Sequence, residues 1–377
     1  MSKTLFIKPY DIFMPRGNSH WGVNSGDFGK IQMLPMPSLF AGALRSCLAV
    51  KDQTSFQEVK QGLKPQNEVY AKVLGSLKEP GSFRIKNICL GKRKVNGFES
   101  IYSMPSDINL FENDEVKISR PVILPDIIKK QTLLPMVAAL KASSKKPASK
   151  CFLTSKGFDK YINGEGISSE DLVKIKDLWE TEMRIGLALD SNTRAAREGY
   201  LYSAETLTFK EDVGFIVEVE GADELLPQKG TLSLGGDQRA ADFEIMEVKK
   251  PNLDISKIEQ ERKFKLILSG PAIFANGWLP DLVNKKDEDY ILSYKGCSAR
   301  LVCASVNGYE TVSGWNMVTN APKTALKSVL AGSVYWFDSF TGSITDLYDL
   351  VDAGWWHENA DKQRVVEGYN RVVLASY

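Results

Sequence analysis

The segment Met183-Arg-Ile-Gly-Leu-Ala-Leu-Asp-Ser-Asn-Thr-Arg-Ala-Ala-Arg-Glu-Gly-Tyr-Leu-Tyr202 combines an apolar run with closely spaced polar groups. Arg194 and Arg197 would share one face of a helical turn, because residues three apart lie together on a helix. Asn192 and Thr193 place short hydrogen-bonding side chains beside them. The segment therefore fits a nucleic-acid contact, and it equally fits a helix–turn–strand junction whose arginines are solvated.

Helix and strand patterns flank this segment. Before it, Leu172–Leu189 has apolar residues at helical spacing and predicts a helix. Within it, Tyr200 and Tyr202 alternate as on a strand, which could present one ring to a nucleobase. After it, Leu207–Val219 predicts two strands joined at 210–212.

The rest of the chain mixes strands with a few helices. Thr4–Pro9 predicts a first strand, and residues 17–29 are rich in Gly, Asn and Ser and predict a long loop. A helix follows, with Ser38 as its expected N-cap. Further strands are expected at Gly81–Leu90, Phe264–Leu268 and Ser333–Phe337. This order favours an α+β fold, and the length suggests about two domains, which we place at residues 1–200 and 201–377.

The formal net charge of +1 argues against a wholly basic nucleic-acid binder. Residues 84–94 and 129–150 are nevertheless basic and free of acids, whereas 338–361 is acidic and free of Lys and Arg. A basic first half suits contact with phosphates, and an acidic stretch is better placed against a protein. Solvated faces and loops whose charged residues happen to share one sign would give the same pattern.

Several classes of site find no support in the sequence. The five cysteines form no Cys-x-x-Cys pair, which predicts reduced, structural thiols and no metal site. No phosphate-binding loop with Gly-Lys-Ser/Thr, no dinucleotide fingerprint and no His-Glu-x-x-His occurs, so no cofactor is expected. The N-terminus lacks the apolar core of a signal peptide and no long apolar run predicts a membrane span, so we expect a cytoplasmic protein.

Two smaller features remain as candidates for binding RNA. His20 lies in the Gly/Asn-rich loop near Arg16, where it could contact RNA or act as a general base. Gly235-Gly236, followed by Arg239, predicts a turn whose backbone N–H groups could approach a phosphate. An ordinary β-turn is the alternative.

Taken together, several blocks resemble the Cmr subunit 3 family of RAMP proteins from type III-B CRISPR effector complexes. Met183–Tyr202 resembles the family's arginine/threonine signature. The other blocks that resemble the family, in its order, are Met36–Arg45, Leu234–Arg239, Pro271–Pro280, Gly314-Trp315 with Pro322-Lys323, and Ala331–Phe337.

The resemblance implies two ferredoxin-like (RRM-related) domains with long inserted loops and a non-catalytic role in antiviral defence. It implies that the chain holds the 5′ repeat-derived tag of the crRNA. It also implies contact with the large polymerase-like subunit and the backbone RAMP subunit, and indirect contact with target RNA. The RNA-binding residues implied are Arg16, His20, Ser38, Arg45, Asn192, Thr193, Arg194, Arg197, Gly235, Gly236 and Arg239.

The chain departs from the family at two places. One proline of the N-terminal pattern is altered within Lys8–Arg16, and Gly354-Trp355-Trp356 stands where RAMP proteins often carry a Gly-x-Gly loop. The tryptophan pair suits a protein interface or a stacking platform. Two other functions stay open: a metal-independent crRNA-processing endoribonuclease that uses His20, and a protein–protein adaptor that does not bind RNA.

Overall fold

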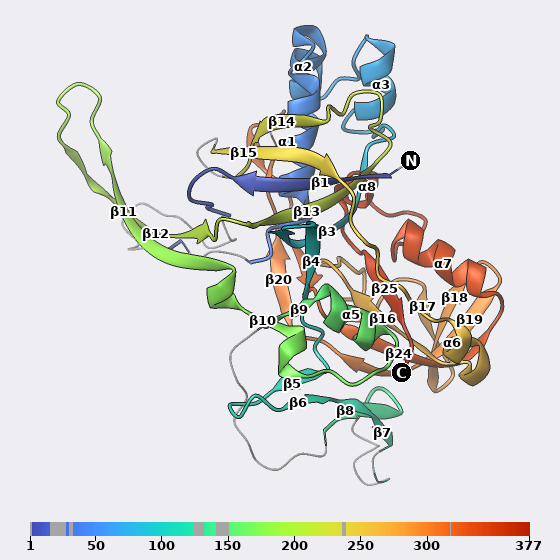
Figure 1. Cartoon of the computed structure of the whole chain (residues 1–377). Coiled ribbons are helices and arrows are strands. Elements are labelled where there is room, and N and C mark those ends of the chain that lie inside the picture. Colours follow the sequence, from blue (N-terminus) through green and yellow to red (C-terminus); the bar gives the residue numbers. More distant parts are fainter. Residues whose placement is uncertain are drawn as a thin grey trace.

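The computed structural model describes residues 2–15, 28–29, 33–123, 125, 132–140, 151–235, 239–316 and 318–377, without the side chains of 28–29, 188 and 197–202. Mixed α and β elements are arranged mainly as antiparallel sheets (Figure 1). Among the described helices, none combines the length and apolar character needed to cross a membrane.

An eight-stranded antiparallel sheet organises the first part of the chain. Across the sheet, its strands are β10 (Leu172–Lys174), β9 (Cys151–Thr154), β4 (Gly97–Ser103), β3 (Arg84–Lys94), β13 (Val213–Glu220), β1 (Ser2–Pro9), β15 (Ala240–Met246) and β14 (Lys229–Ser233). Helices α1 (Pro37–Ala49), α2 (Gln53–Lys60) and α3 (Glu68–Leu74) belong to this part. In the central strand β13, the five consecutive residues Val213–Val217 are buried, because both faces of the sheet are covered there.

A six-stranded sheet organises the second part. Across this sheet, the strands are β17 (Val283–Lys286), β18 (Asp289–Tyr294), β19 (Cys297–Ser305), β24 (Val334–Thr341), β16 (Phe264–Leu268) and β25 (Val372–Ala375). Helix α7 (Ile344–Ala353) contacts β18, β19 and β25 of this sheet, and α6 (Ser256–Glu261) adds Ile258 to its core. Helix α5 (Ser155–Ile162) contacts strands of both sheets, and α8 (Lys362–Glu367) contacts α1 and β3.

Alternate residues of the central strands enter different cores, as the pleat of a strand requires. In β13, Phe215 and Val217 join a core with α1, whereas Ile216 points to the opposite face. That opposite face forms a core shared with Ile267 of β16 and Trp336 of β24. The two sheets are therefore joined by a common hydrophobic core.

A buried ion pair reinforces this junction. Lys265 Nζ on β16 lies 3.2 Å from Asp107 Oδ2, and both side chains are almost fully buried. The hydroxyl of Tyr161 on α5 donates to Asp107 Oδ1 at 2.6 Å, and Lys265 Nζ lies 3.6 Å from the centre of the Tyr161 ring. Burial lowers the pKa of Lys265 and is opposed by the Asp107 carboxylate. The pair thus fixes a loop of the first half against a strand of the second.

Smaller hairpins extend from the sheets. They are β5 (Ile108–Leu110) with β6 (Val116–Ile118), β7 (Arg120–Ile123) with β8 (Met136–Ala139), β20 (Tyr309–Val312) with β23 (Leu326–Val329), and β21 (Trp315–Asn316) with β22 (Ala321–Pro322). A much longer hairpin, β11 (Trp179–Leu189) with β12 (Ala196–Phe209), projects away from the body of the molecule (Figure 1). Strand β2 (Phe28–Gly29) pairs in parallel with β12.

The helix predicted over Leu172–Leu189 is wrong. The segment consists of β10, a 3-10 turn at Ile175–Asp177 and β11. Leu178 and Trp179 are buried, as the helical pattern required, but they are buried at the base of the hairpin. The apolar residues beyond them alternate along a strand, which the helical interpretation of the spacing missed.

Other predicted elements are confirmed, including the strands at Thr4–Pro9 and Phe264–Leu268 and the two strands joined at 210–212. Ser38 is not the N-cap, because α1 begins at Pro37 after Met36. Proline at the first helical position has no N–H to satisfy, so it starts the helix one residue earlier.

The division at residue 200 and the two ferredoxin-like domains stay predictions. Strands of the first sheet extend to residue 246, and the first strand of the second sheet begins at residue 264.

Candidate nucleic-acid interface

The tip of the β11–β12 hairpin presents most of the predicted signature. Its turn is organised by Asp190, whose Oδ1 accepts from the backbone N–H groups of Thr193 and Asn192 at 2.9 Å each. These bonds hold the pKa of the Asp190 carboxyl below its ordinary value, with a further contribution from the Thr193 hydroxyl. The carboxylate thus stabilises the turn, as in Asx-type turns.

Arg194 occupies the position of the turn with a left-handed backbone, at φ +55°. Its backbone N–H donates to Asp190 O at 2.9 Å, and the residue is exposed. Among the contacts of the described residues, the guanidinium of Arg194 has no ion pair. A cation without an internal partner at the end of a projecting hairpin is available to an external anion.

The predicted pairing of Arg194 and Arg197 on one helical face is wrong. Arg194 lies in the turn, whereas Arg197 lies on β12, so the helical spacing does not apply. The backbone of Tyr200 and Tyr202 is in a strand, as predicted. The side chains of Arg197 and both tyrosines lie outside the described part of the structure.

A second group of predicted residues lies at the turn between β14 and β15. Gly235 has φ +89°, a conformation that favours glycine. Leu234 N donates to Arg239 O at 2.8 Å, and Arg239 Nη1 lies 3.3 Å from Asp11 Oδ2. The buried Nε of Arg239 has no hydrogen-bond partner in the described structure. The arginine is therefore only partly satisfied within the chain.

The segment 10–15 connects this turn with the base of the hairpin. Tyr10 N donates to Ala240 O at 3.1 Å. Phe13 N donates to Leu207 O on β12 at 2.7 Å. Arg16 and His20 follow this segment in sequence but lie, with Gly236, outside the described residues.

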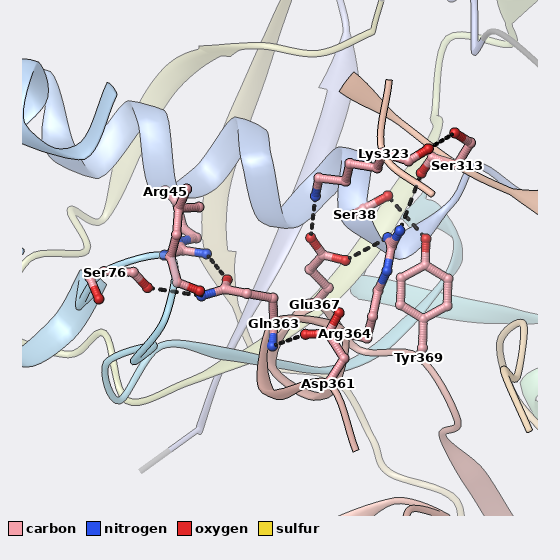
Figure 2. Close-up of polar contacts among 11 residues, drawn as sticks. Ser38, Arg45, Ser76, Ser313, Lys323, Asp361, Gln363, Arg364, Glu367 and Tyr369 are labelled. Carbon is pink, nitrogen blue, oxygen red and sulfur yellow. Dashed lines mark hydrogen bonds and ion pairs between the residues drawn. The ribbon is translucent and has the colours of Figure 1, made fainter. Parts of the chain in front are cut away.

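Two predicted RNA-binding residues of α1 form hydrogen bonds with other parts of the chain (Figure 2). Arg45 donates to Gln363 Oε1 of α8 and to Leu74 O, both at 2.9 Å. Burial lowers the pKa of the Arg45 guanidinium. The hydroxyl of Ser38 lies 3.1 Å from that of Tyr369. Both side chains therefore connect the first helix to the C-terminal part and have few groups left for RNA.

The partners of these residues were not predicted from the sequence. Gln363 also donates to Ser76 O at 2.9 Å and to Leu77 O at 2.8 Å. Next to it, the buried Arg364 donates to Glu367 at 3.0 Å, and Lys323 lies 3.3 Å from the same carboxylate (Figure 2). No local motif marks 363–369, because the contacts join residues far apart in the sequence.

The basic run at 84–94 is largely neutralised within the chain. Its ion pairs are Arg84 with Glu220 (3.7 Å), Lys86 with Asp352 (2.5 Å), Arg93 with Glu244, and Lys94 with Glu99 (3.0 Å). In the described structure, Lys92 alone of this run makes no ion pair. Most of the run is thus paired with carboxylates of the chain, and its contact with phosphates stays a prediction. The lysines of 129–150 lie outside the described residues.

The acidic stretch at 338–361 is likewise engaged within the molecule. Asp338 accepts from Arg300 at 2.8 Å, and Asp349 pairs with Lys295. Asp352 pairs with Lys86 of the basic run, so part of the two opposite runs neutralise each other. Charge clustered in the sequence is therefore not clustered in the same way on the surface.

The tryptophans at 355 and 356 have different environments. Trp355 is fully buried, with ring contacts to Phe274 and Tyr335. Its prediction as a stacking platform or interface residue is wrong, because it belongs to the core of the second sheet. Trp356 is half-buried. His357, next to it, accepts at Nδ1 from Asn359 N at 3.1 Å.

Comparison with known proteins decides the family. The model of the family "CRISPR-associated protein (Cas_Cmr3)" matches residues 5–375. This chain belongs to the Cas_Cmr3 family. The Cas_Cmr3 match thereby confirms the resemblance seen in the sequence and identifies a RAMP-like subunit of the type III-B Cmr class.

One relative of this Cas_Cmr3 chain matches it over part of its length. It is 28% identical over 167 residues to the CRISPR system CMR subunit Cmr3 of Saccharolobus solfataricus, over 44% of this chain and 46% of that protein. The match thus spans about half the length of that relative.

The fold is also similar to that of a solved chain. A chain of the type III-B Cmr-β complex bound to cognate target RNA, solved by cryo-electron microscopy, has a TM-score of 0.52 and 18% identity, over 98% of this chain and 96% of that one. A second structure of that complex, with target RNA and AMPPnP, gives the same TM-score of 0.52. This likeness supports the fold.

Proposed function

We propose that this Cas_Cmr3 chain is a non-catalytic subunit that binds the 5′ tag of the crRNA through the tip of the β11–β12 hairpin. The observation that carries the proposal is the exposed Arg194, held in a turn fixed by Asp190 and lacking an ion pair among the described residues. Asn192 and Thr193 lie in the same turn and supply polar groups for phosphate or sugar contacts.

We extend the proposed contact to the turn between β14 and β15. Arg239 is held by one carboxylate and keeps a buried Nε without a partner among the described residues. Gly235, at φ +89°, lets the backbone of this turn adopt a left-handed conformation, and the space beside its Cα is occupied by Phe13 and Met14. The segment 10–15 connects the turn to the base of the hairpin, so one strand of RNA could follow both. Arg16, His20, Arg197 and Gly236 remain proposed members of the site.

The experiment is a binding titration of the purified chain with a single-stranded RNA that carries the repeat-derived tag. Arg194→Ala with Arg197→Ala should weaken binding at least about tenfold, since hydrogen bonds to charged groups contribute about 1.5–3 kcal/mol. Arg84→Ala is the matched control, because Arg84 is exposed but lies 3.7 Å from Glu220. Equal affinities of the double variant and the wild type would refute the proposed RNA role and favour a pure protein adaptor.

We also propose that RNA is bound without being cut. Among the described residues, no group of three or more His, Cys, Asp and Glu side chains could hold a metal ion. His357 uses Nδ1 to accept from the backbone within its own loop, which suits a structural role. Incubation of the chain with repeat RNA in EDTA should leave the RNA intact. Cleavage that His20→Ala abolishes would instead establish the endoribonuclease.

We propose further that the chain bridges the large polymerase-like subunit and the backbone RAMP subunits, in the cytoplasm, and meets target RNA only indirectly. Membership of the Cas_Cmr3 family supports assembly into a complex of several subunits. Crosslinking of the assembled complex, followed by mass spectrometry, tests the bridge: crosslinks to only one neighbour would contradict it.

A further inference from the structure

The loop at the tip of the β11–β12 hairpin is closed by hydrogen bonds of its own backbone. Strand pairing ends with Leu189 opposite Ala196, and the residues between them form the loop. Asp190 N donates to Ala195 O, and Arg194 N donates to Asp190 O, both at 2.9 Å. The two backbone groups of Asp190 are therefore both bonded across the loop.

The side chain of Asp190 adds a second set of bonds within the same loop. Its Oδ1 accepts from the N–H groups of Asn192 and Thr193 at 2.9 Å each, and from the Thr193 hydroxyl at 3.1 Å. These two residues directly precede Arg194 in the sequence. The carboxylate thus fixes the orientation of the peptide groups that lead into the arginine.

Arg194 has a backbone conformation that its own side chain disfavours. Its φ of +55° lies in the left-handed region, where a residue with a Cβ is strained and glycine is not. A loop that only joined two strands would be more stable with glycine or asparagine at this position. Strain of this kind persists where surrounding contacts enforce it, and it concentrates at functional sites. The arginine therefore points to a role for its guanidinium, and the contacts of Asp190 hold it in place.

We infer that Asp190 is a positioning residue for the proposed contact with RNA: without touching RNA itself, it holds Arg194 in the conformation that presents the guanidinium to a phosphate. The inference rests on the proposed function, which assigns Arg194 to the tag of the crRNA. It adds that the affinity of the chain for RNA depends on a side chain that carries the same sign of charge as RNA.

Asp190 affects the binding of RNA in two opposite ways. Its negative charge repels a phosphate bound beside it, and salt weakens this repulsion because the loop is exposed to solvent. Its hydrogen bonds order the loop before RNA arrives, which reduces the conformational freedom that is lost on binding. If charge dominated, removal of the carboxylate would strengthen binding. If positioning dominates, as we infer, removal of the carboxylate weakens binding.

The test is a double-mutant cycle in the full chain, measured as the affinity for a single-stranded RNA that carries the repeat-derived tag. Asp190→Ala should weaken binding about fivefold or more, because the loop and the arginine must then be ordered on binding. Asp190→Asn should stay within about twofold of the wild type, since its amide oxygen can still accept from the two backbone N–H groups. In a chain that already carries Arg194→Ala, Asp190→Ala should change the affinity less than about twofold, because the group it positions is gone.

Glu182→Ala is the matched control, since Glu182 is another exposed acid of the same hairpin and lies 3.5 Å from Arg184. Its removal should not weaken binding, and thermal unfolding of every variant checks that the body of the molecule is unchanged.

Three results would overturn the inference: undiminished affinity of Asp190→Ala, an equal loss in Asp190→Asn, which would mean that the charge itself is used, or an equal loss with and without Arg194. If Arg194→Ala alone leaves the affinity unchanged, the proposed function fails and this inference fails with it. A loss in Arg194→Ala without a loss in Asp190→Ala overturns only the inference.

Discussion

Lys265 shows how a single side chain can hold the two halves of the molecule together. Lys265→Met leaves the buried Asp107 carboxylate without its cation, so we expect a loss of about 3–5 kcal/mol in the free energy of unfolding. Urea unfolding at pH 7 measures this loss. Restoring charge balance with Asp107→Asn in the same chain should recover part of it, because the carbonyl of an asparagine side chain can still accept from Tyr161.

An exposed ion pair provides the comparison. Lys295→Met removes the partner of Asp349, and both side chains are about half exposed. Solvated pairs contribute little, so the expected loss is under about 1 kcal/mol. Equal effects of the two lysine substitutions would show that the buried pair is not a specific tether.

At the scale of elements, α1 and α8 depend on Gln363. Its amide accepts from Arg45 and donates to Ser76 O and Leu77 O, so Gln363→Ala leaves a half-buried guanidinium short of an acceptor. We expect a loss of about 1–3 kcal/mol in the free energy of unfolding. Lys362→Ala, on the same helix but exposed, is the control and should have little effect. A comparable loss in both variants would indicate a general effect on α8.

The contacts between α5 and the segment after it give the molecule a stability that depends on pH. Burial raises the pKa of Asp171, but hydrogen bonds from Lys160 and Ser168 outweigh it and hold the pKa below its ordinary value. When folding lowers the pKa of a carboxyl group, the ionised group stabilises the native state at pH values above its pKa in the unfolded chain. This contribution is lost as the pH falls below about 4. The stability difference between wild type and Asp171→Asn should therefore be larger at pH 7 than at pH 3, as urea titrations at the two pH values would show. An unchanged difference would exclude a role for the ionised carboxylate.

At the scale of the whole molecule, the shared core predicts cooperative unfolding. Trp336 is 1% exposed and packs in the cluster that contains residues of both sheets. Trp336→Ala should cost about 3–5 kcal/mol, the usual range for removing a large buried aromatic side chain. The wild type should unfold in one transition, with circular dichroism and tryptophan fluorescence coinciding. Two separated transitions would show that the sheets unfold independently.

The parts of the fold that depend on local pattern were predictable. Phe264–Leu268 is a strand because a short apolar run is buried on both faces, and α1 follows from its apolar spacing. The helix prediction for Leu172–Leu189 failed because Leu178 and Trp179, buried at the base of a hairpin, mimic one buried turn of a helix.

The candidate site was predictable only where its residues contact others that are close to them in the sequence. Asn192, Thr193 and Arg194 do meet in one turn, although it is a hairpin and not a helix. Arg45 and Lys86 looked available to RNA, but their partners are Gln363 and Asp352. Partners that lie hundreds of positions away in the sequence cannot be inferred from local charge.

The contacts between α1 and α8 also govern the order in which the chain can fold. Arg45 and Gln363 are separated by 318 positions, and Ser38 and Tyr369 by 331. Translation proceeds at about 5–20 residues per second, so α1 must wait tens of seconds for the segment that completes its surroundings. During that interval the N-terminal sheet lacks the partner for its second face. A chain with such high contact order should fold slowly and benefit from chaperones while it is being synthesised.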